Sequence, residues 1–119
     1  MAQAAAAPKM ERRRREMDME RIAILEVDVR VAATGMRASR LIGSDVYNDR
    51  EEHIGTLDDL MIADNGTVAF AILSVGGFLG IGSRLVAVIF DRLLIDDYRV
   101  VLPGATREEL KRLPEFDYR

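Results

Sequence analysis

The chain has 119 residues, of which 49% are hydrophobic and 31% are charged, with no cysteine and a net charge of −3. This length predicts one domain with a single core, and the lack of cysteine excludes disulfides, a thiolate nucleophile and cysteine-bound metal. The acidic balance argues against nucleic acid as a partner. We also expect no membrane span, because no run of eighteen uncharged apolar residues occurs.

Charge divides the chain into two parts. The first 37 residues carry eight Lys or Arg and six Asp or Glu, whereas the rest carry nine and fourteen. We expect residues 1–21 to be a charged extension, disordered over 2–8 and able to form a helix with Glu/Arg pairs over 10–25. The Ala-rich start resembles the residues that follow a signal-peptidase cut, which predicts a periplasmic or secreted protein; a cytoplasmic protein is the alternative.

Residues 22–37 are predicted to form an N-terminal strand and a connector. Between 24 and 31, apolar and charged residues alternate, which is the period-two pattern of a half-buried strand. The segment 32–36 contains Gly35 and is typical of a connector. The strand could pair within its own domain or, because the connector is short, with a second copy of the chain.

From residue 38 onward, short apolar runs separated by turn signals predict six strands and one helix. The strands are expected at 40–47, 54–62, 67–75, 84–90, 92–95 and 99–102. The runs 67–75 and 84–90 are apolar on both faces, which predicts two central, buried strands. Asn65-Gly66 predicts a hairpin with positive φ at both residues. Thr106 and Glu109 form a capping box that begins a helix ending at Pro114.

This spacing of strands indicates an all-β fold, a small barrel or sandwich, with closure removing the open edges. Several runs also carry a family resemblance: 38–43, 46–48, 54–62, the glycine-rich turn, 85–88, Asp91, Leu93, 100–106 and 113–116. Together they resemble the PRC-barrel domain family, which includes the C-terminal domains of the photosynthetic reaction centre H subunit and of a ribosome maturation factor. Ile89-Phe90 departs from the family pattern, in which a proline precedes an aromatic residue.

The resemblance implies a six-stranded PRC-type β-barrel over residues 38–119, with a short C-terminal helix. It implies an interaction or assembly module and no single activity, because fold alone does not determine function. We therefore expect a non-enzymatic module that binds protein, with a homo-oligomer such as a dimer as the expected state. No cofactor and no metal are predicted.

The candidate contact site is the glycine-rich turn between the two apolar runs. Large apolar residues at a loop tip, where polar residues are usual, predict a partner contact. Fold-back of these side chains onto the barrel end is the alternative. A phosphate-binding loop is excluded, because no Lys-Ser/Thr pair follows the last glycine and a strand follows the turn. The candidate residues are Gly76, Gly77, Phe78, Leu79, Gly80, Ile81 and Gly82.

An alternative function is a small-ligand or cation-binding barrel that uses rim groups. The candidates are Asp58, Asp59, Arg84 and Asp91. The two adjacent aspartates are expected on opposite faces of a strand, so they would not act as a pair. Arg84 interrupts an apolar run and is expected to pair with an acidic neighbour. His53, the only histidine, is expected at the surface, and the serines have no base within reach, so no catalytic residue is predicted.

Overall fold

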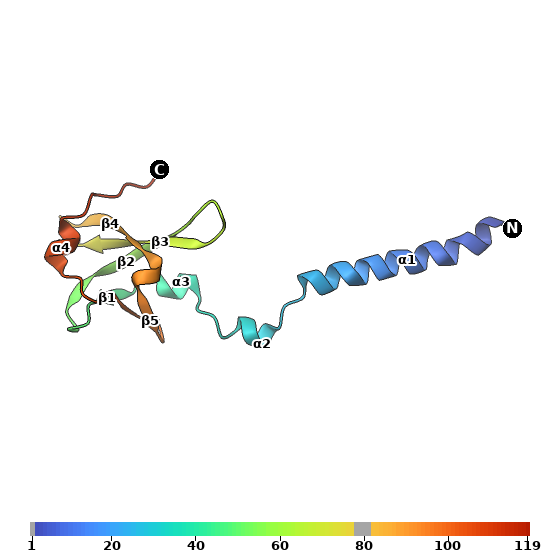
Figure 1. Cartoon of the computed structure of the whole chain (residues 1–119), viewed down its shortest axis with the longest axis horizontal. Helices are drawn as coiled ribbons and strands as arrows, with labels where there is room; N and C mark the ends of the chain where they lie inside the picture. The colour runs from blue at the N-terminus through green and yellow to red at the C-terminus, as the bar shows by residue number, and fades with distance from the viewer. Residues whose placement is uncertain (1, 78–81) are drawn as a thin grey trace. The chain divides into compact units, whose positions relative to one another are not determined.

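The computed structural model describes residues 2–77 and 82–119. The chain forms two compact units, Met1–Gly35 and Met36–Arg119 (Figure 1). Four residues of the predicted contact turn, Phe78, Leu79, Gly80 and Ile81, lie outside the described residues, so their role stays a prediction.

The first unit contains two helices, α1 (Ala2–Leu25) and α2 (Val29–Ala32). The predicted helix over 10–25 is confirmed, and Arg15 pairs with Glu11 at 3.9 Å one turn away. The expected disorder of residues 2–8 is wrong, because the alanines of this segment have the highest helix propensity and α1 begins at Ala2.

The predicted strand over 24–31 is also wrong. Asp28 Oδ1 accepts a hydrogen bond from the Arg30 N–H at 2.9 Å and caps α2, so a local side-chain bond favours a helical turn there. Alternation makes a strand only where another strand pairs with it, and no described residue pairs with this segment. An exchanged strand requires a second copy of the chain, so that alternative stays a prediction.

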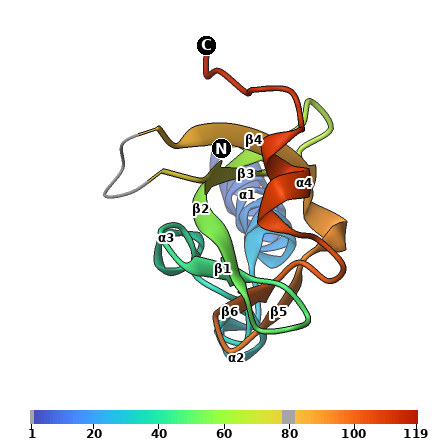
Figure 2. The ribbon, with the colours of Figure 1, turned by 90° about the vertical axis from the view of Figure 1, so that its left-hand side faces the viewer.

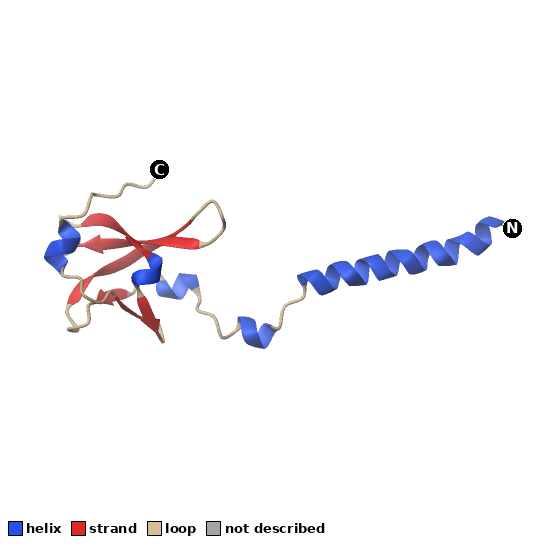
Figure 3. Ribbon diagram, in the orientation of Figure 1, coloured by secondary structure: helices blue, strands red, loops and turns tan. Residues whose placement is uncertain are grey.

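The second unit is built on six strands with three short helical segments (Figures 2 and 3). In chain order these are α3 (Ala38–Leu41), β1 (Asp45–Tyr47), β2 (His53–Ile62), β3 (Val68–Val75), β4 (Arg84–Ile89), η1 (Phe90–Arg92), β5 (Leu94–Asp96), β6 (Arg99–Val101) and α4 (Arg107–Lys111). The predicted strand over 40–47 is shorter than expected, because 38–41 form a helical turn that buries Leu41.

The sheet has the order β4-β3-β2-β1-β6-β5, with β1 and β6 parallel and all other neighbours antiparallel. The six-stranded sheet is confirmed, but the closed all-β barrel is not, because β4 and β5 end the sheet without pairing to each other within the described residues. The burial predicted for β3 is confirmed in its second half. The same prediction is wrong for β4, an edge strand in which only Val86 is buried.

The core lies on one face of this sheet. Its twelve buried side chains are Leu41, Val46, Ile54, Leu57, Ala71, Leu73, Val75, Val86, Leu93, Val100, Leu102 and Leu110. Leu110 comes from α4, which Thr106 caps as predicted: its Oγ1 accepts from the Glu109 N–H at 3.1 Å. α4 contacts β2, β3 and β4 and so covers that part of the core.

Positive-φ residues occur in the β2–β3 and β5–β6 hairpins, but not as the sequence predicts. Gly66 has φ +85, whereas Asn65 keeps a negative φ, so the β2–β3 loop is not the expected turn. The hairpin between β5 and β6 instead has positive φ at Asp97 and Tyr98. The Tyr98 hydroxyl accepts from the Arg37 N–H at 2.9 Å, which fixes this tyrosine in a conformation that non-glycine residues rarely adopt.

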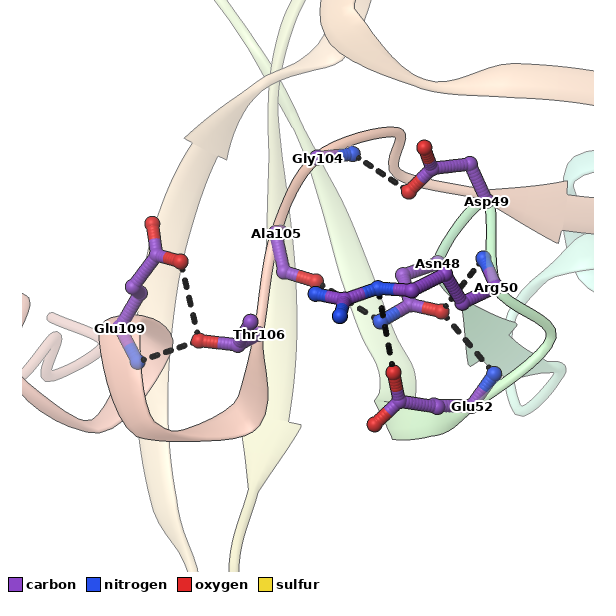
Figure 4. Close-up of polar contacts among 8 residues, drawn as sticks. All are labelled: Asn48, Asp49, Arg50, Glu52, Gly104, Ala105, Thr106 and Glu109. Atoms are coloured by element: carbon purple, nitrogen blue, oxygen red, sulfur yellow. Dashed lines mark hydrogen bonds and ion pairs between the residues drawn. The ribbon is translucent and has the colours of Figure 1, made fainter.

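Asn48 is the one buried polar residue of the described chain, and it ties two loops together (Figure 4). Its Oδ1 accepts from the N–H groups of Arg50 and Glu52, both at 2.9 Å, and its Nδ2 donates to the Ala105 carbonyl at 3.0 Å. The loop after β1 is thereby held against the segment that leads into α4.

Candidate functional site

The sheet of the second unit has an apolar face opposite its core, which we call the outer face. Pairing between strands places Met61, Phe70, Ile72, Ala87 and Ile89 on it, because residues opposite one another in a ladder share a face. A soluble sheet usually carries polar side chains on its solvent face. This face of β3 and β4 therefore indicates a contact.

Part of the outer face is exposed, and we call this part the outer patch. Its members are Ile62, Val68, Phe70 and Ile89, which expose 70%, 37%, 46% and 53% of their surfaces. They come from three adjacent strands: Ile62 pairs with Val68, and Phe70 pairs with Ile89. A contiguous exposed group of this kind marks an interaction surface more strongly than single exposed apolar residues.

A hollow of about 360 Å³ lies beside the outer patch. Its lining is almost wholly apolar and consists of Met61, Ile62, Ala63, Phe70, Ile72, Ala87 and Phe116. Ile72 is fully buried although it is not a member of the core cluster, so its cover comes from the outer side. Phe116, from the C-terminal tail, lines the same hollow.

The C-terminal tail, residues 114–119, runs past β4 (Figure 1). The Phe116 N–H donates to the Leu85 carbonyl at 2.8 Å, which is the type of bond that an added strand would make at the edge of β4. The Phe116 ring packs edge-on against Tyr118 with centroids 5.0 Å apart. The Tyr118 hydroxyl donates to Asp58 Oδ2 at 2.7 Å.

Asp58 and Asp59 do not act independently, contrary to the prediction that they point to opposite faces. A β-bulge between Leu57 and Asp59 breaks the alternation of β2 at this point. As a result both carboxylates act on the Tyr118 phenol. Partial desolvation, the hydrogen bond to Asp58 and the negative charges of both aspartates raise the pKa of Tyr118 well above its ordinary value.

This pKa shift makes the tail sensitive to alkali. The unfolded chain releases the Tyr118 proton near pH 10, whereas the folded chain keeps this proton to a higher pH. The Tyr118–Asp58 hydrogen bond therefore contributes fully to stability below about pH 10, and its contribution falls as the pH rises further. We expect ultraviolet titration to detect one phenol that ionises late, and Tyr118→Phe to remove it. A late-ionising phenol that persists in Tyr118→Phe would contradict the assignment.

The described part of the glycine-rich turn behaves as a turn. Gly76, Gly77 and Gly82 all have φ +78, which explains why glycines are required there. A strand follows the turn, as expected. Gly76 and Gly77 also line a polar cleft of about 280 Å³, together with His53, Ile54, Gly55, Thr56, Ser74, Ser83 and Arg107. The sequence did not predict this cleft, because its residues come from separate segments.

Arg84 lacks the acidic partner that we predicted. Its Nη2 donates to the Leu113 carbonyl at 2.9 Å, and its buried Nε has no partner among the described residues. The guanidinium therefore holds Leu113, the residue just before the C-terminal tail, at the edge of β4. Its role is to position the tail, and no ion pair of the described chain includes it.

The remaining candidates do not converge on a reactive centre. Asp91 is exposed in η1, and His53 lies at the surface, where its Nε2 contacts Asp45 Oδ1 at 2.9 Å. Within residues 2–77 and 82–119, no three His, Cys, Asp or Glu side chains gather closely enough to hold a metal ion. Helices in the same ranges are also too short or too polar to cross a membrane.

Comparison with known protein families assigns residues 33–106 to the PRC-barrel domain. The match spans more than half of the chain. The chain belongs to the PRC-barrel domain family. The PRC-barrel match ends at Thr106, so α4 and the tail lie beyond it. A comparison with curated proteins found no match. Membership supports a general role in domain-mediated interaction.

Proposed function

We propose that the chain is a non-enzymatic protein-interaction and assembly module, and that the outer patch is its contact surface. The observation that carries this proposal is the exposure of Ile62, Phe70 and Ile89 on adjacent strands of a domain that is otherwise rich in charge. The family assignment supports an interaction role of this kind. The proposal places the contact on the sheet, whereas the sequence alone directed attention to the glycine-rich turn.

The size of the outer patch bears on the kind of contact. Four partly exposed side chains of this size leave on the order of 300 Å² of apolar surface. A standard interface buries about 800 Å² on each partner. The outer patch alone therefore suits a transient partner, or forms one part of a larger contact surface.

The cation-binding alternative has less support. The Tyr118 hydroxyl already donates a hydrogen bond to the Asp58 carboxylate. The described residues also offer no cluster of three metal ligands. The polar cleft near Arg107 contains a cationic side chain, which repels a bound cation.

A photo-crosslinking experiment tests the proposed surface. A photoreactive phenylalanine analogue replaces Ile62 in the outer patch or, as a matched control, Leu94, which is also exposed, at 61%, but lies on β5. We expect discrete protein adducts in the source cells from position 62 and none from position 94. Equal yields from the two positions, or no adduct from position 62, would contradict the proposal.

A further inference from the structure

The two edges of the sheet differ in how well they are protected against pairing. β5 is three residues long and ends in Asp96, which pairs with Arg99 on β6, so this edge is short and charged. β4 is six residues long, and between Leu85 and Ile89 it carries no charged residue and no proline. Short length, charge and proline are the usual means by which proteins prevent edge-to-edge pairing.

The backbone of β4 offers open hydrogen-bonding groups. The Leu85 carbonyl accepts from Phe116 in the tail, so the polar groups of this residue point away from β3. The β3–β4 register has no bulge, so Ala87 and Ile89 point their N–H and C=O groups the same way. The tail uses only the Leu85 end of the edge among the described contacts, which leaves Ala87–Ile89 available.

We propose that β4 pairs antiparallel with β4 of a second copy, centred on Val88. This inference rests on the proposed interaction role and names its first partner. The pairing places Ile89 of each copy opposite Ala87 of the other copy. A large side chain therefore meets a small one in both of these pairs. The contact is isologous, which gives a closed dimer rather than a fibre.

The pairing has a consequence for the outer patch. Directly opposite residues of paired strands share a face, so the outer faces of the two copies become one continuous surface. Two outer patches then lie on the same side of a twelve-stranded sheet. The single patch is smaller than a standard interface. The dimer would supply the additional apolar surface.

The register can be tested by disulfide trapping, because the natural chain contains no cysteine. The full chain is prepared as Ala87→Cys, as Ile89→Cys and, as a control on the other edge, as Leu94→Cys. Opposite positions in an antiparallel pair lie about 5.5 Å apart at Cα, which suits a disulfide. We expect a mixture of the first two variants to form a mixed disulfide at least about ten-fold faster than either variant alone or with Leu94→Cys.

Sedimentation of the cysteine-free chain provides the second readout. We expect a monomer–dimer equilibrium in the micromolar range, weakened at least about ten-fold by Ala87→Pro, which removes an edge N–H without breaking a β3–β4 bond. Ala87→Ser keeps that N–H and a small side chain, so it should leave the equilibrium unchanged. A chain that stays monomeric, or crosslinking without preference for the mixed pair, would overturn the dimer. Adducts of the Ile62 position with foreign proteins would still support the proposed function.

Discussion

Asn48→Ala is expected to destabilise the second unit by about 3 kcal/mol, which corresponds to a fall of roughly 15 °C in melting temperature for a domain of this size. The substitution removes three hydrogen bonds at once and leaves the N–H groups of Arg50 and Glu52 and the Ala105 carbonyl without their partner. It also leaves a void, because Asn48 is only 1% exposed. Urea unfolding followed by tyrosine fluorescence measures the loss.

Asp49→Ala is the matched control for this experiment. Asp49 is adjacent and also bonds across to the same segment, since its Oδ1 accepts from the Gly104 N–H at 2.9 Å. The hydrogen bond from Gly104 lowers the pKa of Asp49. Because Asp49 is exposed, water can replace its carboxylate as the acceptor for the Gly104 N–H. We expect a clearly smaller loss than for Asn48→Ala, because water can take the place of the lost acceptor. Equal losses for the two variants would show that Asn48 does not act through burial.

Gly55→Ala is expected to destabilise the sheet by about 2 kcal/mol through steric conflict. A Cβ at this position would lie 2.8 Å from the Ser74 carbonyl oxygen on β3, and a backbone atom cannot move aside as a flexible side chain could. Gly55 also pairs with Val46 on β1, so strands on both sides resist the shift. The free energy of unfolding in urea measures the effect.

Gly66→Ala is the matched comparison for Gly55→Ala, because it also adds a Cβ to a glycine of the same sheet region. A Cβ at Gly66 would meet nothing within 4 Å, but φ is +85, so the cost is backbone strain of about 1 kcal/mol. Gly66→Asn should recover part of that loss, because asparagine tolerates this conformation, whereas Gly55→Asn should be worse than Gly55→Ala. A Gly55→Ala variant as stable as the natural chain would show that β2 and β3 can separate without cost.

These two glycines show what local sequence reveals. Gly66 follows an asparagine between two apolar runs, so a need for positive φ could be predicted there, although the structure places only the glycine in that region. Gly55 lies within a strand, and its requirement comes from Ser74, nineteen residues away in the chain. Local patterns report backbone conformation, but close approach between strands depends on the tertiary register.

The outer patch is not predicted by the sequence for a related reason. The runs 67–75 and 84–90 are apolar on both faces, and this pattern predicts burial on both sides. The observed strand order places β4 at an edge, so one of those faces is only partly covered by Phe116 and the tail. Strand order is not encoded in periodicity, so the pattern could not distinguish a buried face from an exposed one.

The N-terminal segment shows the opposite error. Alternation over 24–31 is a genuine pattern, yet a strand requires a neighbouring strand. The Asp28 side chain instead accepts a hydrogen bond from the backbone N–H of Arg30, only two residues away. By contrast, the capping box at Thr106 and Glu109 was predicted correctly, because all the groups that form it lie within one helical turn.

The region matched by the family ends before the folded domain does. The family match ends at Thr106, but Leu110 from α4 belongs to the core, and Phe116 lines the hollow on the other face together with the fully buried Ile72. A recombinant fragment trimmed to the matched region would therefore lose both of these apolar contacts, one on each face of the sheet. The residues after the matched region are therefore part of the folded domain.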